Sequence, residues 1–179
     1  VNGDFTSNSP FQSVYIEEYA KLELSGEENV ILGGVSSLTG TVTYDRIGDQ
    51  TIAPINYNNL EIKNQGIKSM TNVFIDNVNG DFRIYPEATY EIDGYLFLNG
   101  ENILNEGTLK INESLVYATD TSGTFNVSNE GIIDFTDNNN GRLFLNGNVL
   151  SLGNLDNNGG GVGYVSSNNQ QIDVNVTYN

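Results

Sequence analysis

The residues of this chain that could do acid–base chemistry are its carboxylates, because the sequence contains no histidine and no cysteine. Two carboxyl groups on either side of a glycosidic bond can act as acid and base in hydrolysis. The closely spaced pairs are Glu17 with Glu18, Glu27 with Glu28, and Asp134 with Asp137. A chain with 23 acidic residues contains such neighbours by chance. We therefore expect no catalytic residue and predict that the protein is not an enzyme.

Calcium binding is the other chemistry that acidic turns support, because Ca²⁺ takes carboxylate and amide oxygens as ligands. The segments Asp76–Asp81 and Asp137–Gly141 each offer several such oxygens. Neither segment has the ligand spacing of an EF-hand loop, and neither lies in a glycine-rich nonapeptide repeat. We expect solvated turns here, with no metal site and no cofactor, and keep calcium as the alternative.

Two further kinds of site are not supported by the spacing of the residues. Arg46, Arg83 and Arg142 are scattered, whereas an enzyme that cleaves acidic polysaccharides needs clustered cations. The segment Gly159–Gly163 lacks the Lys-Ser/Thr that follows a phosphate-binding loop. We predict a loose turn over the glycine-rich segment Asn157–Gly163.

Composition limits the partners. The formal net charge of -16 disfavours binding to nucleic acid and to anionic lipid. No apolar run reaches the length of about 18 residues that crosses a membrane. The 28 asparagines and 20 glycines favour turns, and stacked asparagines can form side-chain ladders. The first residue is Val1, so we expect a processed chain or a fragment.

A repeat predicts the architecture. The pentapeptide Leu96–Gly100 recurs letter for letter at Leu143–Gly147, 47 residues later. The tripeptide Asn105–Gly107 recurs at Asn129–Gly131, 24 residues later. The first spacing is close to twice the second, which indicates one structural repeat of about 23 to 24 residues. Periods of this length are typical of solenoids, in which each repeat forms one coil, or rung, on the previous one.

The residues after the two tripeptides predict how the rungs stack. Both segments alternate apolar and polar residues, as strands with one buried face do. In a parallel sheet with strands about 4.8 Å apart, the apolar positions of one rung lie over those of the next. The predicted neighbours are Leu109 with Ile133, Ile111 with Phe135, and Lys110 with Asp134 on the solvent side. The same spacing places the rung between the pentapeptides near Ala118–Thr121.

Other segments predict further strands, namely Ala20–Leu24, Val30–Leu32, Gly40–Tyr44, Phe82–Ile84, Tyr90–Ile92, Val149–Leu152 and an unbroken last strand, Ile172–Tyr178. Turn signals recur every 8 to 12 residues. This spacing suits three strands per rung and also suits an antiparallel β-sandwich. We predict an all-β parallel β-helix (β-solenoid) with rungs of about 23 to 24 residues, and the sandwich is the alternative. Residues 1–179 form a single solenoid domain or part of a longer repeat array.

The segment Gly40–Tyr44, followed by Gly48–Ile52 and Tyr57–Ile62, resembles a repeat of large secreted surface proteins of the Bacteroidota. The resemblance continues through Gly66–Lys68 to Asn79–Ile84. It implies an adhesin-like protein exported by the type IX route and folded as a parallel β-helix. It supplies no catalytic residues.

These observations predict a non-enzymatic extracellular protein with a structural or adhesive role at the cell surface, as a self-assembling filament subunit. The expected partners are further copies, neighbouring domains of the same protein, glycans or surfaces, without nucleic acid and without membrane insertion. The alternative function is a carbohydrate-binding module of a secreted protein.

Overall fold

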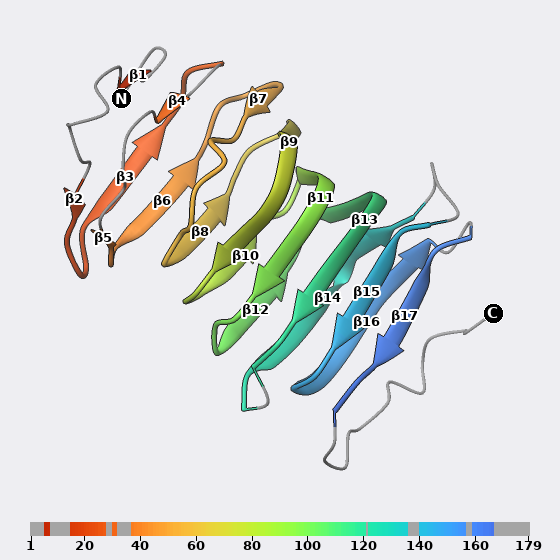
Figure 1. Cartoon of the computed structure of the whole chain (residues 1–179). Helices are drawn as coiled ribbons and strands as arrows, with labels where there is room; N and C mark the ends of the chain where they lie inside the picture. Colours follow the sequence, from red (N-terminus) through yellow and green to blue (C-terminus); the bar gives the residue numbers. More distant parts are fainter. Residues whose placement is uncertain are drawn as a thin grey trace.

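The computed structural model of the chain describes residues 6–7, 15–27, 30–31, 37–120, 122–135, 140–156 and 159–166. No helix occurs in these ranges, and every strand pairing in them is parallel. Thirteen strands form one sheet. The strands follow one another along a single axis, with β3 (Lys21–Leu24) near one end and β17 (Gly161–Tyr164) at the other (Figure 1). The predicted parallel β-helix is therefore confirmed, and the antiparallel sandwich is excluded.

The remaining strands, in chain order, are β1 (Thr6–Ser7), β2 (Tyr15–Ile16), β4 (Val30–Ile31), β5 (Ser37–Leu38), β6 (Thr41–Tyr44), β7 (Gln50–Thr51), β8 (Asn59–Ile62), β9 (Gly66–Val78), β10 (Phe82–Ile84), β11 (Ala88–Leu98), β12 (Asn102–Asn105), β13 (Thr108–Ala118), β14 (Thr124–Asp134), β15 (Arg142–Leu145) and β16 (Asn148–Asp156). The predicted last strand, Ile172–Tyr178, lies outside the described residues.

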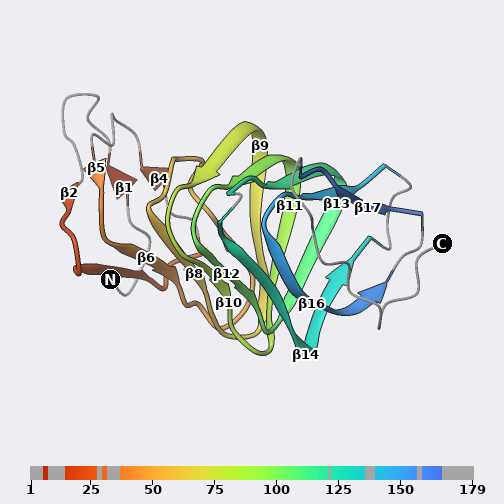
Figure 2. The same cartoon turned by 90° about the horizontal axis from the view of Figure 1, so that it is seen from below.

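Each rung crosses three faces, which we call A, B and C. Face A consists of β3, β6, β8, β10, β12 and the first halves of β14 and β16. Face B consists of β7, the first halves of β9, β11 and β13, and the second halves of β14 and β16. Face C consists of the second halves of β9, β11 and β13, then β15 and β17. Viewed from below, the rungs form loops around a common interior (Figure 2).

The predicted stacking of the tripeptide repeats is confirmed. Leu109 pairs with Ile133 and Lys110 with Asp134 in parallel register. Ile111 and Phe135 are both fully buried, one residue beyond the end of this paired segment. One apolar column therefore lines the interior, and Lys110 and Asp134 lie on its outer side.

The predicted position of the intermediate rung is wrong, because the two steps between the pentapeptides differ in length. Between the two pentapeptides lies Val116–Ala118, not Ala118–Thr121, because Leu96 pairs with Val116 and Val116 pairs with Leu143. These two steps are 20 and 27 residues long, and only their mean is close to 23.5. Across the sheet the step between paired residues falls as low as 18, from Val42 to Leu60. Corner loops and register shifts within the strands absorb these differences.

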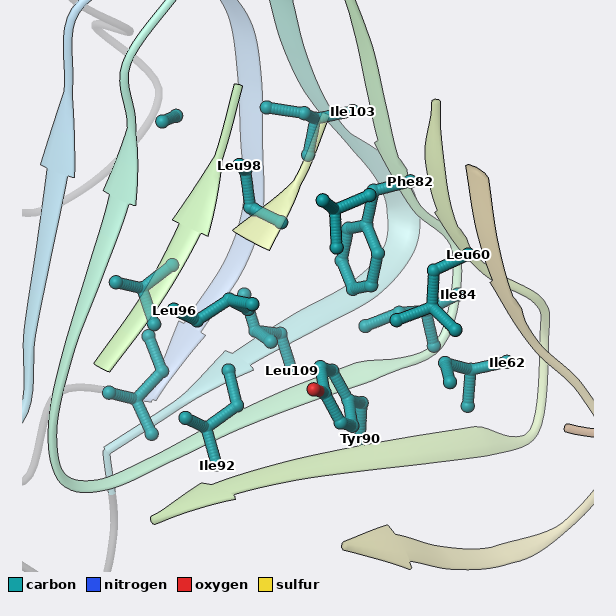
Figure 3. Packing of buried hydrophobic residues seen from close by; sticks show 14 of the residues in the cluster. Leu60, Ile62, Phe82, Ile84, Tyr90, Ile92, Leu96, Leu98, Ile103 and Leu109 are labelled. Atoms are coloured by element: carbon teal, nitrogen blue, oxygen red, sulfur yellow. The ribbon is translucent and has the colours of Figure 1, made fainter. Parts of the chain in front are cut away.

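The core is a continuous apolar cluster that runs through all three faces (Figure 3). Phe82 and Ile84 of face A, Tyr90 of face B, and Leu96 and Leu98 of face C are each at most 1% exposed. Burial of each large side chain stabilises the fold by about 1.5 to 3 kcal/mol. The stacked columns therefore hold neighbouring rungs together.

Glycine is required at the corner between faces C and A. A Cβ on Gly100 would lie 1.7 Å from the carbonyl oxygen of Gly80, in the rung below. A Cβ on Gly147 would similarly lie 2.4 Å from the carbonyl oxygen of Gly123. This close backbone approach explains why both pentapeptide copies end in Asn-Gly.

The glycine-rich segment predicted as a loose turn is a strand over part of its length. Gly161–Tyr164 forms β17 and pairs with β15. The Phe144 ring lies against Gly163, where a Cβ would be 2.9 Å from its Cδ1. Glycine there makes room for a side chain of the neighbouring rung, and not for a change of chain direction.

Candidate functional site

Of the three carboxylate pairs considered from the sequence, the structure describes both members only for Glu17 with Glu18. Glu17 and Glu18 are exposed, beside the turn that precedes β3. Glu28 and Asp137 lie outside the described residues, so the structure describes only one carboxylate of each of their pairs. Asp134 is half-buried on the outer side of face B. None of the described carboxylates of these pairs lies in the interior.

The three arginines remain apart, each on its own rung. Arg46 forms an ion pair with Glu27 at 3.2 Å, and Arg83 forms one with Glu106 at 2.7 Å. Arg142 donates a hydrogen bond from Nη1 to the carbonyl oxygen of Gly141 at 2.8 Å. The first two arginines therefore cross-link neighbouring rungs through carboxylates.

The candidate calcium segments do not assemble a site in the described part of the chain. Asp81 accepts a hydrogen bond from Asn102 Nδ2 at 2.9 Å, across one rung. The side chain of Asp76 and residues 137–139 lie outside the description. Among the described residues, no group of three or more Asp, Glu, His or Cys side chains is arranged to hold a metal ion.

The most unexpected titratable group is Lys68, which is fully buried. Its ammonium donates to the carbonyl oxygens of Gly48 at 3.2 Å, Asn64 at 2.9 Å and Gln65 at 2.8 Å. Burial lowers the pKa of Lys68 to about 8, against the attraction of nearby aspartates. With its donors aimed at backbone carbonyls, Lys68 holds a corner of the solenoid together and is not positioned for reaction with a ligand.

Glu61 is the centre of a charged network on the outer side of face A. It forms ion pairs with Lys21 at 2.9 Å and Lys63 at 3.1 Å, and it accepts hydrogen bonds from Thr43 at 2.9 Å and Tyr85 at 3.1 Å. Burial favours the neutral acid, but the hydrogen bonds from Lys21, Thr43 and Lys63 outweigh it and lower the pKa of Glu61 to about 2. The network joins neighbouring rungs electrostatically.

The outer side of face C carries a stack of aromatic rings. We call Phe97, Tyr117 and Phe144 the aromatic ladder. Phe97 and Tyr117 are stacked at 5.0 Å between centroids with an interplanar angle of 9°, and Tyr117 and Phe144 at 4.8 Å with 17°. All three rings are half-buried. The ladder follows directly from the parallel register, which places each ring over the previous one.

A polar column runs beside the aromatic ladder, two residues further along each strand and at the corner. It consists of Asn99, Thr119 and Asn146. Thr119 Oγ1 donates to Asn99 Oδ1, and Asn146 Nδ2 donates to the Thr119 carbonyl oxygen at 3.0 Å. The column continues toward the N-terminus, because Asn99 Nδ2 donates to Asn79 Oδ1 at 3.2 Å. The asparagine ladder expected from the composition therefore exists at this corner.

Beyond this column the corner is hollowed into a shallow groove floored by glycine. The groove crosses several rungs, and its polar lining includes Asn79, Asn99, Asp81, Glu101 and Asp120. A backbone hydrogen bond and a side-chain hydrogen bond from Ser122 lower the pKa of Asp120. The groove is thus acidic, whereas the neighbouring aromatic ladder and polar column carry no charge.

Sequence reasoning missed both Lys68 and the aromatic ladder. The ladder has a sequence signal, since Leu96–Leu98, Val116–Ala118 and Leu143–Leu145 all read apolar-aromatic-apolar. The signal was hidden because the mean spacing places the intermediate rung near Ala118–Thr121 instead. Lys68 has no such signal, because a lysine between Ile67 and Ser69 predicts an exposed position.

Comparisons of the chain with family models, with curated proteins and with solved structures found no match. Within the described residues there is no helix with the length and hydropathy needed to cross a membrane.

Proposed function

We propose that this chain is a non-enzymatic structural and adhesive part of a secreted cell-surface protein, in which copies join end to end into a filament. The observation that carries the proposal is the continuous parallel stacking of rungs along one axis. The first and last rungs lie at opposite ends and differ from each other, so contact between copies is head-to-tail. Head-to-tail contacts that do not close into a ring generate filaments.

Of the described strands, β17 is the last in the stack, and its outer edge has the geometry that such growth requires. Within the described chain, β17 pairs with β15 alone. The amides of Gly161 and Val165 donate to the carbonyl oxygens of Gly141 and Leu145, each at 3.0 Å. Because successive amides of a strand point to opposite sides, the amide of Val162 points away from β15. An edge of this kind can pair with another strand.

Side-chain chemistry supports a structural role. The carboxylates of Glu27, Glu61 and Glu106 each join a basic side chain of another rung. The high negative charge suits a soluble extracellular protein. The resemblance of residues 40–84 to secreted surface proteins of the Bacteroidota supports the same location and an adhesive role.

The substitution Val162→Pro tests the proposal. Proline removes the outward amide and leaves the hydrogen bonds to β15 in place, so it should prevent end-to-end growth without unfolding the solenoid. Electron microscopy and sedimentation of the wild-type protein at increasing concentration should show rods. Val162→Thr, which keeps the amide, should also form rods. Compact monodisperse wild-type particles at every concentration would contradict the proposal.

A further inference from the structure

Face C bears an outer surface unlike the rest of this acidic protein. Its central column is the aromatic ladder, and its second column is Asn99, Thr119 and Asn146. None of these six side chains is charged. A third outward column contains Tyr95, which is 45% exposed, then Leu115 in the next rung and Arg142 in the rung after that. In a chain with 23 acidic residues, these three columns therefore hold no carboxylate, and their one charged side chain is a cation.

The ring geometry leaves part of each aromatic face uncovered. Parallel rings in contact lie about 3.5 to 4.0 Å apart, so the centroid distances of 4.8 and 5.0 Å require a lateral offset. Neighbouring rings therefore overlap only in part, and all three rings are half-buried. The glycine at position 163 adds no side chain over Phe144 in the next rung.

Hydrogen-bonding groups lie beside the rings at a regular spacing. In every rung of the ladder an amide or hydroxyl side chain follows the ring by two residues, on the same side of the strand. Tyr117 adds a phenol within the ladder itself. Rings that contact apolar C–H surfaces, next to rows of donors and acceptors, match a ligand with apolar faces and a rim of hydroxyls.

We propose that this surface binds an extended uncharged polysaccharide, which lies along the solenoid axis with its sugar rings against the aromatic ladder. The proposal rests on the proposed function and names what the filament adheres to. The neighbouring groove, lined by Asp81, Glu101 and Asp120, would repel an anionic chain. These three carboxylates outnumber the single cation, Arg142, at the other side of the ladder, and thus favour a neutral ligand over an acidic polysaccharide.

A protein partner fits this surface less well. Specific protein–protein interfaces typically involve about 20 to 30 residues on each side. The three columns of this surface contain only nine side chains, three from each of three rungs. A narrow strip of rings and amides at constant spacing instead suits a ligand that is itself a linear repeat.

The test is isothermal titration of the full chain with four hexasaccharides, at a concentration where the protein is monomeric. Cellohexaose, N-acetylated chitohexaose and maltohexaose are the neutral probes, and hexagalacturonate is the anionic probe. We expect saturable binding of at least one neutral probe. Tyr117→Ser and Phe144→Ser should each weaken that binding at least tenfold, and Tyr117→Phe should retain it within about threefold.

The matched control is the double substitution Ile67→Ser/Ile132→Ser. These two isoleucines lie on the outer side of face B and are 37% and 36% exposed, so the control removes apolar surface elsewhere. It should bind within twofold of wild type. Circular dichroism establishes that each variant is folded, and Phe144→Ser carries the test if Tyr117→Ser is not.

Three results would overturn the proposal. They are no binding of any neutral probe at millimolar concentration, unchanged binding by the folded serine variants of face C, or binding of hexagalacturonate alone. Rod formation is measured without sugar, so failure of the titration leaves the filament proposal standing. Failure of rod formation likewise leaves the titration interpretable.

Discussion

The inner column of face B has a different character at its two ends. Toward the N-terminus it holds Gln50 and Lys68, which are at most 2% exposed. Further along, the same column holds Leu109 and Ile133, also buried. Tyr90 lies between the two parts, since it pairs with Lys68 on one side and Leu109 on the other. In successive rungs, the same buried position is therefore occupied by an amide, an ammonium, a phenol and then hydrocarbon side chains.

The difference follows from where the corners direct their carbonyl groups. Gln50 Nε2 donates to the carbonyl oxygens of Leu24 at 2.7 Å and Gly26 at 2.8 Å, and Lys68 donates to three corner carbonyls. In the later rungs the column packs within the apolar cluster. Side chains buried in this column are therefore stabilised by satisfied hydrogen bonds in one half of the solenoid and by apolar contacts in the other.

The largest effect is expected from transferring the polar residue to the apolar half. Leu109→Lys places an ammonium between Tyr90 and Ile133, in an apolar environment. We expect a loss of about 4 kcal/mol or more in the free energy of unfolding, measured by urea denaturation. The conservative change Leu109→Met should cost less than about 1.5 kcal/mol. A Leu109→Lys protein as stable as wild type would show that the two halves do not differ.

The reverse substitution should cost somewhat less. Lys68→Met removes the ammonium and leaves the carbonyl groups of Gly48, Asn64 and Gln65 without their donor. We expect a loss of about 3 kcal/mol, again from urea denaturation. Lys63→Met is the matched control, because Lys63 lies on the outer side with 26% of its side chain exposed, and it should cost at most about 1 kcal/mol. If Lys68→Met instead increased the free energy of unfolding, water molecules would be donating hydrogen bonds to these carbonyl groups in place of the ammonium.

The comparison also shows what could be predicted from the sequence. The pairs Leu109–Ile133 and Lys110–Asp134 were predictable, because hydropathy alternates in both segments and the tripeptides fix their register. The burial of Lys68 was not predictable. Lys68 is buried and its neighbour Ile67 is 37% exposed, which is the reverse of what their hydropathies predict. Such a reversal depends on carbonyl groups that only the folded corner brings together.

The candidate surface could be predicted only in part. Both Leu-Phe-Leu segments were recognised as equivalent, so Phe97 and Phe144 were known to occupy one column. Tyr117 was missed because the intervening steps of 20 and 27 residues are unequal. Loop lengths at the corners are weakly constrained by packing, and the sequence alone therefore does not fix the register of a rung that lacks the repeat.

The outer surfaces of faces A and C differ as well, since the Glu61 network lies on face A and the aromatic ladder on face C. Tyr117→Ser removes the middle ring of the aromatic ladder, and we expect a loss of about 1 to 2 kcal/mol. Because stacking involves no charge, the loss measured by urea denaturation should be the same at low and high salt. A loss that disappears at high salt would contradict this interpretation.

The smallest effect is expected at the charged network. Glu61→Gln should cost about 1 kcal/mol at pH 7 and low salt, after allowance for solvent screening, and less at high salt. Because the pKa of Glu61 is lowered from 4.5 to about 2 in the folded protein, its contribution is complete above pH 4.5 and is lost as the pH falls toward 2. Urea denaturation across this range should show the two proteins converging in acid. The exposed Glu101, changed to Gln, is the control, and equal convergence for both variants would contradict the role of Glu61.

The stacking of rungs on which these proposals depend can be measured with a pair of cysteines, since the protein contains none. Lys110 and Asp134 are register partners on the outer side of face B, at a strand spacing of about 4.8 Å that suits a disulfide. Lys110→Cys/Asp134→Cys should form an intramolecular disulfide on oxidation, detected by mass spectrometry of peptides under non-reducing conditions. Lys110→Cys/Asp156→Cys, which spans two rungs, should not. The opposite result, with no disulfide in the first pair, would contradict the parallel solenoid.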